Sequence, residues 1–208
     1  MSTATLSHDA HDAHAGHASA PPATCKFGMI MFLASEAMLF AGLIGGYIVL
    51  RLSQPQWPPF PDSPDLPVKL TGINTIFLVA SSFTYHFAEG AVKKGRSGLF
   101  WLAVTIFLGS LFVGIQCYEW WHLHHEGLWF NKYGVYGSSF FLITGFHGAH
   151  VVVGVLLITW VFLRQLFLKC YTPARHVSLE NVGLYWHFVD VVWIFLFALV
   201  YISPLIWH

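Results

Sequence analysis

The amino-acid sequence predicts an all-α integral membrane protein with five transmembrane helices packed in a bundle. Apolar residues make up 56% of the 208-residue chain, and charged residues make up 10%. Soluble domains carry about 25% charged residues, so this chain is far too apolar to be one. Five apolar stretches each reach the roughly 20 residues that cross a bilayer. They span residues 27–50, 72–92, 98–117, 138–163 and 183–204.

Residues 1–26 precede the first apolar stretch and are predominantly polar. They contain no apolar run that would make a signal peptide. Histidines recur there at a spacing of three, at His8, His11, His14 and His17. We expect a disordered inner tail over 1–26 and one five-helix transmembrane domain over 27–208. Such histidine tracts bind metals weakly and opportunistically, so no role is assigned to this one.

The segments between the stretches differ in composition. Residues 51–70 hold six prolines, which forbid a helix and favour an extended connection. Residues 93–97 are few and basic, so the second and third helices should be antiparallel neighbours. Residues 119–137 are rich in Trp and Tyr, as expected at a membrane surface. We find no internal repeat of the kind that many transporters show.

The distribution of basic residues predicts the orientation. Ten basic and ten acidic residues cancel, so the total charge does not favour nucleic acid as a partner. An inner N-terminus, with an outer C-terminus, places seven of the ten basic residues inside, as the positive-inside rule requires. The inner residues are Lys26, Lys93, Lys94, Arg96, Arg164, Lys169 and Arg175, and the outer ones are Arg51, Lys69 and Lys132.

Glu36 interrupts the first apolar stretch. Nine residues at about 1.5 Å each place it roughly 13 Å beyond Phe27, near the middle of the bilayer. Phe40, Leu43 and Tyr47 share its helical face. Desolvation favours the neutral acid at such a position. A hydrogen bond to a neighbouring helix is the simplest use for it, and proton handling or lipid contact stays open.

Four further polar groups interrupt the last two stretches. His147 and His150 lie three residues apart on one helical face, and His187 and Asp190 repeat that spacing. The aspartate can orient the imidazole or share a proton with it. We favour interhelical hydrogen bonds over metal or haem ligation. The alternative is a haem-binding membrane cytochrome, with His86 and His187 as ligands at a similar depth.

Other candidates lie near the helix ends. Arg164 and Arg175 are basic residues at inner helix ends, where they either hold lipid phosphates or simply set topology. Gln116 and Glu119 are expected at a solvated outer helix end. No metal site is predicted from the cysteines, since they stand singly at Cys25, Cys117 and Cys170.

Five segments resemble the successive helices of subunit III of haem-copper oxidases, in the same order and over nearly everything after residue 26. They read MFLASEAMLF, GINTIFLVASSFTYHFA, GIQCYEWWHL, YGVYGSSFFLITGFHGAHVVVG and GLYWHFVDVVWIFLF. The last two are long and specific. The mitochondrial form of this subunit has seven helices, and the chain resembles the shorter bacterial form that lacks the first two. An even number of missing helices leaves the orientation unchanged.

The resemblance implies a lipid-facing cleft between the first two helices and the remaining three, with bound phospholipid. It implies that subunits I and II carry the haems and coppers, while this chain carries no cofactor. Subunit III is expected to support subunit I and its proton uptake, in a complex that takes electrons from cytochrome c. A bacterial inner (plasma) membrane is the implied location, and membership of a larger respiratory supercomplex is left open.

Particular residues match the family's motifs. Glu36 matches its intramembrane carboxylate, His147 and His150 its G-F-H-G-x-H pair, and His187 and Asp190 its W-H-F-x-D pair. None is expected to perform covalent chemistry.

Two related complexes remain as alternatives. Ser35-Glu36, Gln116 and residues 134–137 resemble the cytochrome c branch, whereas residues 81–85 are also similar to the quinol oxidase branch. An accessory subunit of nitric oxide reductase shares parts of the pattern.

Overall fold

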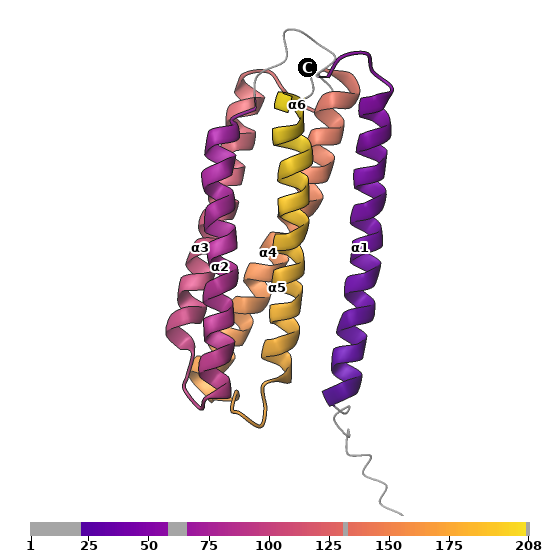
Figure 1. Ribbon diagram of the computed structural model, residues 1–208. Helices are drawn as coiled ribbons and strands as arrows, with labels where there is room; N and C mark the ends of the chain where they lie inside the picture. Colours follow the sequence, from indigo (N-terminus) through magenta and orange to yellow (C-terminus); the bar gives the residue numbers. More distant parts are fainter. Residues whose placement is uncertain (1–21, 58–65, 131–132, 207–208) are drawn as a thin grey trace, which may run out of the picture.

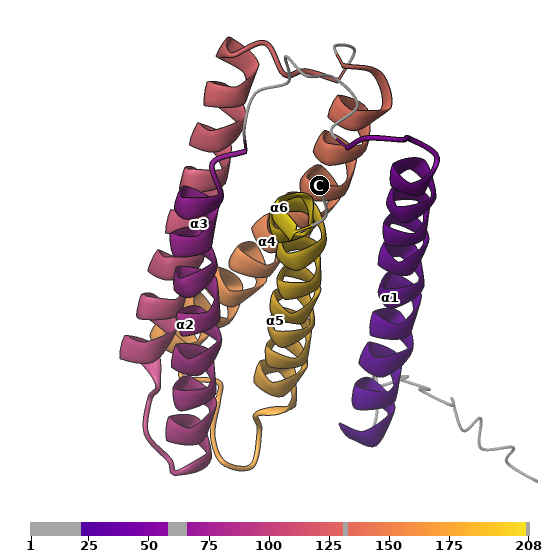
Figure 2. The ribbon, with the colours of Figure 1, turned by 45° about the horizontal axis from the view of Figure 1, so that its top comes forward.

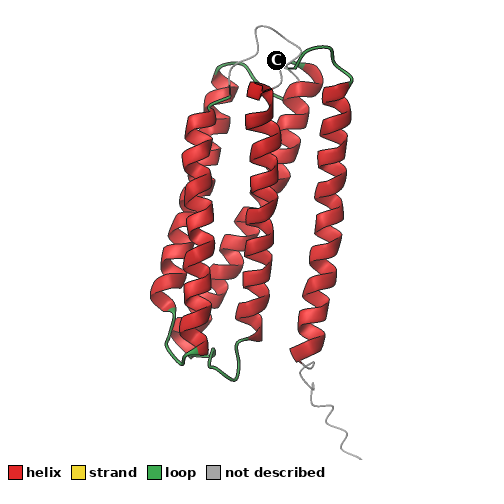
Figure 3. Cartoon of the chain, viewed as in Figure 1, coloured by secondary structure: helices red, strands yellow, loops and turns green. Residues whose placement is uncertain are grey.

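The computed structural model describes residues 22–57, 66–130 and 133–206. Within these ranges five long helices run up and down in a bundle (Figures 1 and 3). They are α1 (Pro22–Leu52), α2 (Val68–Lys93), α3 (Leu99–His125), α4 (Gly134–Leu168) and α5 (Val177–Leu196). A π-helical segment, η1 (Phe197–Ile202), and the short α6 (Ser203–Ile206) continue α5. Residues 1–21 of the predicted tail lie outside the described residues.

The helices extend beyond the apolar stretches that predict them. Helix α1 begins at Pro22, because a proline in the first turn lacks only an N–H that would have no partner there. Helix α3 continues to His125, eight residues past the predicted end. Hydropathy marks the part of a helix that suits lipid, and it does not mark where the helix ends.

Four of the described helices are long and apolar enough to cross a membrane: α1, α3, α4 and the continuous stretch from α5 through η1. Helix α2 falls short because polar residues occupy its inner face. Those that are buried are Thr71, Asn74 and Ser81. The prediction of an all-helical membrane protein is confirmed, and a fifth crossing by α2 stays a prediction.

The core of the bundle lies between α2, α3, α4 and α5, around Trp186 and Trp193 of α5, both fully buried. Glycines make room for the indole of Trp186. A Cβ atom on Gly154 would lie 2.6 Å from the Trp186 ring, and one on Gly109 would lie 3.0 Å from it. Small residues of this kind let membrane helices approach closely. Trp186 therefore fixes the spacing of α3, α4 and α5.

Helix α1 stands at the edge of this bundle, beside α5 and part of α4 (Figures 1 and 2). In its most apolar window only 6% of residues are buried, against 50% for the stretch from α5 through η1. Helix α1 is therefore much less covered by the rest of the chain than α5 is. Helix α2 packs its polar inner face against α3 and α5. The lipid-facing cleft that the resemblance implies stays a prediction.

Candidate functional site: polar groups between the helices

Glu36 of α1 and His150 of α4 form a pair that joins the two helices. Glu36 Oε2 lies 2.9 Å from His150 Nε2. Both side chains are mostly covered, with 18% and 16% of their surface exposed. The rings of Phe40 and His150 meet edge to face at 4.9 Å between centroids. The structure thus brings together two residues whose partnership the sequence could not specify.

The protons of this pair are constrained by a third contact. His150 Nδ1 lies 2.7 Å from the carbonyl oxygen of Phe146. A carbonyl oxygen only accepts, so Nδ1 must carry a proton, which leaves Nε2 as the acceptor in the neutral ring. In the neutral state of the pair the remaining proton therefore belongs to Glu36, which donates to Nε2. Moving that one proton across the 2.9 Å contact turns the neutral pair into an ion pair.

His187 and Asp190 of α5 meet on a hydroxyl of α2. Ser82 Oγ lies 2.8 Å from His187 Nδ1 and is also hydrogen-bonded to Asp190 Oδ2. A hydroxyl has one proton to donate, so it can donate to only one of these neighbours while accepting from the other. The three groups form a short chain in which the serine relays between imidazole and carboxyl. The predicted sharing between His187 and Asp190 is therefore indirect.

The side chain of His147 lies in different surroundings from that of His150, three residues further along α4. It is fully buried, stacked on Trp193 at 4.7 Å between ring centroids. Neither ring nitrogen has a hydrogen-bond partner among the described residues. An i, i+3 spacing leaves two side chains about 60° apart around a helix, enough to direct His150 toward α1 and His147 into the core.

Glu119 corrects an expectation from the sequence. It was expected at a solvated helix end, but it is fully buried, and Gln116 is 5% exposed. Tyr201 donates to Glu119 Oε1 at 2.6 Å, and Thr71 donates to Oε2 at 3.0 Å. Gln116 donates to the same Oε2 at 3.3 Å. The carboxyl thus links α2, α3 and η1.

The polar side chains on the buried face of α2 were not among the functional residues predicted from the sequence. Its buried positions are Thr71, Asn74, Leu78, Ser81, Tyr85, Ala88 and Val92, a helical period of three to four residues. That period was visible in the sequence. It would have placed Thr71 and Ser81 inside the bundle and predicted polar partners for them on α3 and α5.

At the end of the bundle where α1 begins, Glu180 of α5 contacts basic residues from two other helices. Its carboxylate lies 2.5 Å from the Lys26 amine and 2.8 Å from the Lys93 amine. His176 Nε2 lies 3.3 Å away. The amide of Asn181 donates to the carbonyl oxygen of Cys25 at 3.4 Å. This cluster ties the beginning of α1 to α5 and α2.

The two arginines predicted to hold lipid phosphates have different surroundings. The Arg164 guanidinium lies 4.8 Å from the centre of the Trp160 ring, an interfacial cation–π contact. Arg175 is exposed in the connection between α4 and α5, where its backbone pairs with that of Thr172.

The geometry of these His, Asp and Glu side chains favours hydrogen-bonded pairs over a set of metal ligands. Within the described ranges, no three side chains of His, Cys, Asp or Glu come together closely enough to hold a metal ion. Glu36 is engaged with His150, and Asp190 and His187 are engaged with Ser82. The arrangement can hold helices together and shift protons over one hydrogen bond.

Comparisons with known proteins identify the family of the sequence. The sequence model described as "Cytochrome c oxidase subunit III" matches residues 7–205. The chain is 42% identical over 178 residues to a cytochrome c oxidase subunit 3 of Synechocystis sp., covering 85% of this chain and 74% of that protein. It is 43% identical over 183 residues to a probable cytochrome c oxidase subunit 3 of Nocardia farcinica, covering 86% and 88%.

The likeness extends to animals. The chain is 36% identical over 183 residues to the cytochrome c oxidase subunit 3 of Gallus gallus, covering 85% of this chain and 68% of that protein. A family match across nearly the whole length, with relatives above 40% identity, confirms the resemblance carried by the helix motifs. This chain belongs to the cytochrome c oxidase subunit III family.

Proposed function

We propose that this chain is the accessory subunit III of a proton-pumping cytochrome c oxidase, the respiratory complex that reduces oxygen to water. Family membership supports the assignment to the complex. The observation that supports an accessory role is that the membrane-depth polar groups are committed to one another: Glu36 to His150, and His187 and Asp190 to Ser82. The chain's contribution is to hold a helix bundle beside the redox subunits.

In this proposal five helices cross the membrane, with the N-terminus inside and the C-terminus outside. The proposal includes the lipid-facing cleft between the first two helices and the remaining three, and the largely uncovered apolar surface of α1 supports lipid contact there. Arg164 and Arg175 hold phospholipid headgroups at its inner side. The haems and coppers belong to the partner subunits I and II, cytochrome c is the electron donor, and the location is a bacterial plasma membrane.

Purification through a tag on this chain, in mild detergent, tests the proposal. We expect two further oxidase subunits to co-purify and the complex to show haem absorption bands in a reduced-minus-oxidised spectrum. This chain, separated from them, should show none. Haem in stoichiometric amount on the separated chain would instead favour the membrane cytochrome with His86 and His187 as ligands. Reduction of the complex by quinol but not by cytochrome c would favour a quinol oxidase.

The headgroup assignment needs its own test. Replacing Arg164 and Arg175 together by glutamine should lower the number of phospholipids that remain on the purified complex, counted by mass spectrometry. Unchanged lipid content would mean that these arginines serve topology alone.

A further inference from the structure

A basic hollow lies at the inner end of the bundle, on the side formed by α2, α3 and α4. The connection between α2 and α3 forms one wall, and the end of α4 forms the other. Three shallow pockets, of about 320, 350 and 490 Å³, share Arg96 in their lining. Lys94 and Trp101 line one part, and Lys169 lines another. We call the three together the Arg96 hollow.

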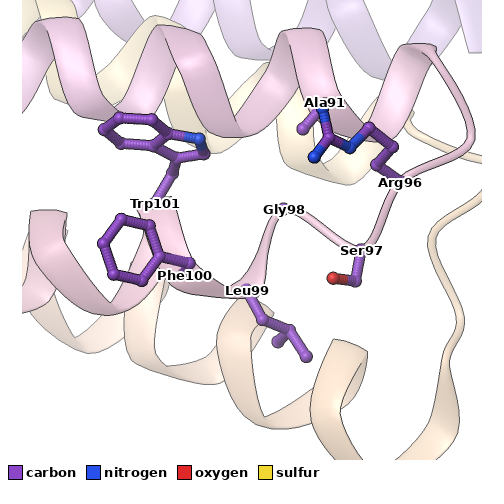
Figure 4. Close-up of a pocket in the computed structure, with 7 residues that line it drawn as sticks. All are labelled: Ala91, Arg96, Ser97, Gly98, Leu99, Phe100 and Trp101. Atoms are coloured by element: carbon purple, nitrogen blue, oxygen red, sulfur yellow. The ribbon is translucent and has the colours of Figure 1, made fainter.

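The backbone fixes the position of Arg96. Its N–H donates to the carbonyl oxygen of Ala91 at 2.8 Å, and the N–H of Gly95 donates to that of Val92 at 2.9 Å. Gly98 has a φ of +63°, and a Cβ atom there would lie 2.9 Å from the carbonyl oxygen of Ala88. The chain therefore turns tightly back onto α2. Figure 4 shows Arg96 and Trp101 on opposite sides of Gly98 in this turn.

The hollow holds positive charge that no carboxylate balances. Among the described residues, Lys94, Arg96 and Lys169 form no ion pair, and all three are exposed. The neighbouring Lys93 differs, because Glu180 binds it at 2.8 Å. Three cations around one hollow attract an anion with several acceptor oxygens.

The walls combine polar and apolar groups. Ser97 and Thr172 contribute hydroxyl groups to the lining. Phe100, 71% exposed, and Leu166, 44% exposed, continue the wall toward the membrane. Trp101 packs between Phe87 and Phe100, with ring centroids 5.2 and 5.4 Å apart. Basic groups beside exposed aromatic and aliphatic side chains match the two halves of a phospholipid.

We propose that the Arg96 hollow binds an anionic phospholipid, with its phosphate near Arg96, Lys94 and Lys169 and its acyl chains along the exposed faces of α2, α3 and α4. The apolar wall favours a lipid over free phosphate, since free phosphate makes no use of Phe100 or Leu166. This site is separate from Arg164 and Arg175. It depends on the inner end of the bundle lying at a membrane surface, and it does not depend on which electron donor the complex uses.

The test uses the intact complex, purified through a tag on this chain and stripped of loosely held lipid. Phosphatidylglycerol is added back and its binding measured by native mass spectrometry. Variants are Arg96→Gln and the triple Lys94→Gln, Arg96→Gln, Lys169→Gln. Lys69→Gln is the matched control, because Lys69 is also exposed and carries the same charge at the opposite end of α2. Arg96→Lys keeps the charge.

Each removed charge should weaken phosphatidylglycerol binding about fivefold, from the usual contribution of one basic residue near an anionic surface. Lys69→Gln and Arg96→Lys should bind within about twofold of the parent. Co-purification of the partner subunits at normal stoichiometry checks that the variants fold. Equal binding in the triple variant and the parent would overturn the proposal.

Two further results would also overturn it by naming another occupant. Glycerol phosphate, which has the headgroup without acyl chains, should compete poorly, and competition as strong as that of phosphatidylglycerol would indicate a free-phosphate site. A zero-length crosslink between the amine of Lys94 or Lys169 and a carboxylate of another subunit would show that protein covers the hollow.

A strong preference for phosphatidylglycerol over phosphatidylcholine, lost in the triple variant, is the supporting outcome.

Discussion

Helix α1 and the bundle of α2 to α5 are held in place by different kinds of contact. The bundle surrounds Trp186 and Trp193 with fully buried aromatic and aliphatic side chains. Helix α1 has two buried large side chains, Phe40 and Tyr47, packs Leu33, Leu43 and Ile44 partly against the core, and leaves most of its other apolar residues exposed. Polar contacts at three heights attach it. They are Lys26 to Glu180, Glu36 to His150, and Arg51 to Ser203.

The difference follows from the solvent around a membrane protein. Lipid tails are as apolar as leucine, so a helix loses little by leaving its apolar side chains in lipid. Close packing and polar contacts then decide which helices associate. The bundle relies mainly on close packing, and α1 relies mainly on polar contacts. Four predictions, ordered by expected effect, test this division.

The largest effect should come from filling the space around Trp186. Gly154→Ala places a methyl group 2.6 Å from the rigid indole, so α4 and α5 must move apart. We expect a loss of about 1–3 kcal/mol in stability, seen as a lower Tm of the purified complex. Gly148→Ala is the control on the same helix, where a Cβ atom meets nothing within 4 Å. Equal Tm values for both variants would contradict the role given to Trp186.

Next in size is the buried carboxyl of Glu119. Tyr201→Phe removes the 2.6 Å hydrogen bond and leaves Oε1 without that donor in a buried site. A loss of about 1–3 kcal/mol is expected. Tyr118→Phe is the matched control, since Tyr118 is 54% exposed on the same helix as Glu119. Thermal unfolding that is the same in both variants would mean that the Glu119 cluster is not part of the bundle's stability.

A smaller effect is expected at the middle of α1. In the neutral pair Glu36 carries the proton that it donates to His150, and a protonated carboxyl in an apolar site is what hydrophobic carbodiimides modify. We expect labelling at Glu36, its loss in Glu36→Gln, and little labelling of Asp190, which shares its proton through Ser82. Peptide mass spectrometry locates the label.

Glu36→Gln keeps the shape and a hydrogen-bonding group, so the complex should assemble and retain substantial electron transfer. Helix α1 should still loosen, with faster hydrogen exchange around residues 33–40 than in the parent. Complete loss of oxygen reduction in a correctly assembled Glu36→Gln complex would show that this carboxyl is catalytic.

The smallest effect is expected at the Glu180 cluster, beside the beginning of α1. Glu180→Gln removes two ion pairs to amines that are 47% exposed, and contacts of that kind contribute about 0–1 kcal/mol. The Tm should change little, while hydrogen exchange in the first turns of α1 increases. Glu126→Gln, at the C-terminal end of α3, is the control. A large drop in Tm for Glu180→Gln would mean that α1 is as firmly integrated as the other helices.

The sequence was sufficient for the class of fold and for the membrane-depth polar residues, because apolar length and interrupting charges are local properties. It was not sufficient for their partners. Glu36 and His150 are 114 residues apart, and no local pattern joins them. Glu119 was predicted to be solvated because helix α3 continues beyond the apolar stretch that predicted it. The π-helical turns of η1, which direct Tyr201 toward Glu119, leave no signal in hydropathy.

The small residues of α1 teach a related lesson. Ala34, Ala37, Ala41 and Gly45 form a stripe of small residues at helical spacing, a pattern that favours the close approach of another helix. The three alanines are exposed, and none of the described helices covers them. A spacing of small residues predicts that a helix can be approached closely. It does not say whether the approaching helix belongs to the same chain.

The polar attachments of α1 also set the order in which the protein can be built. The partners of Cys25, Glu36 and Arg51 lie 114 to 156 residues further along the chain. At 5–20 residues per second, a ribosome needs about 6–30 s to synthesise that length. During this interval the newly inserted α1 has lipid or the insertion machinery as its neighbour, with Glu36 not yet matched to an imidazole. Completion of the last helix is therefore the event that lets the first one take its final place.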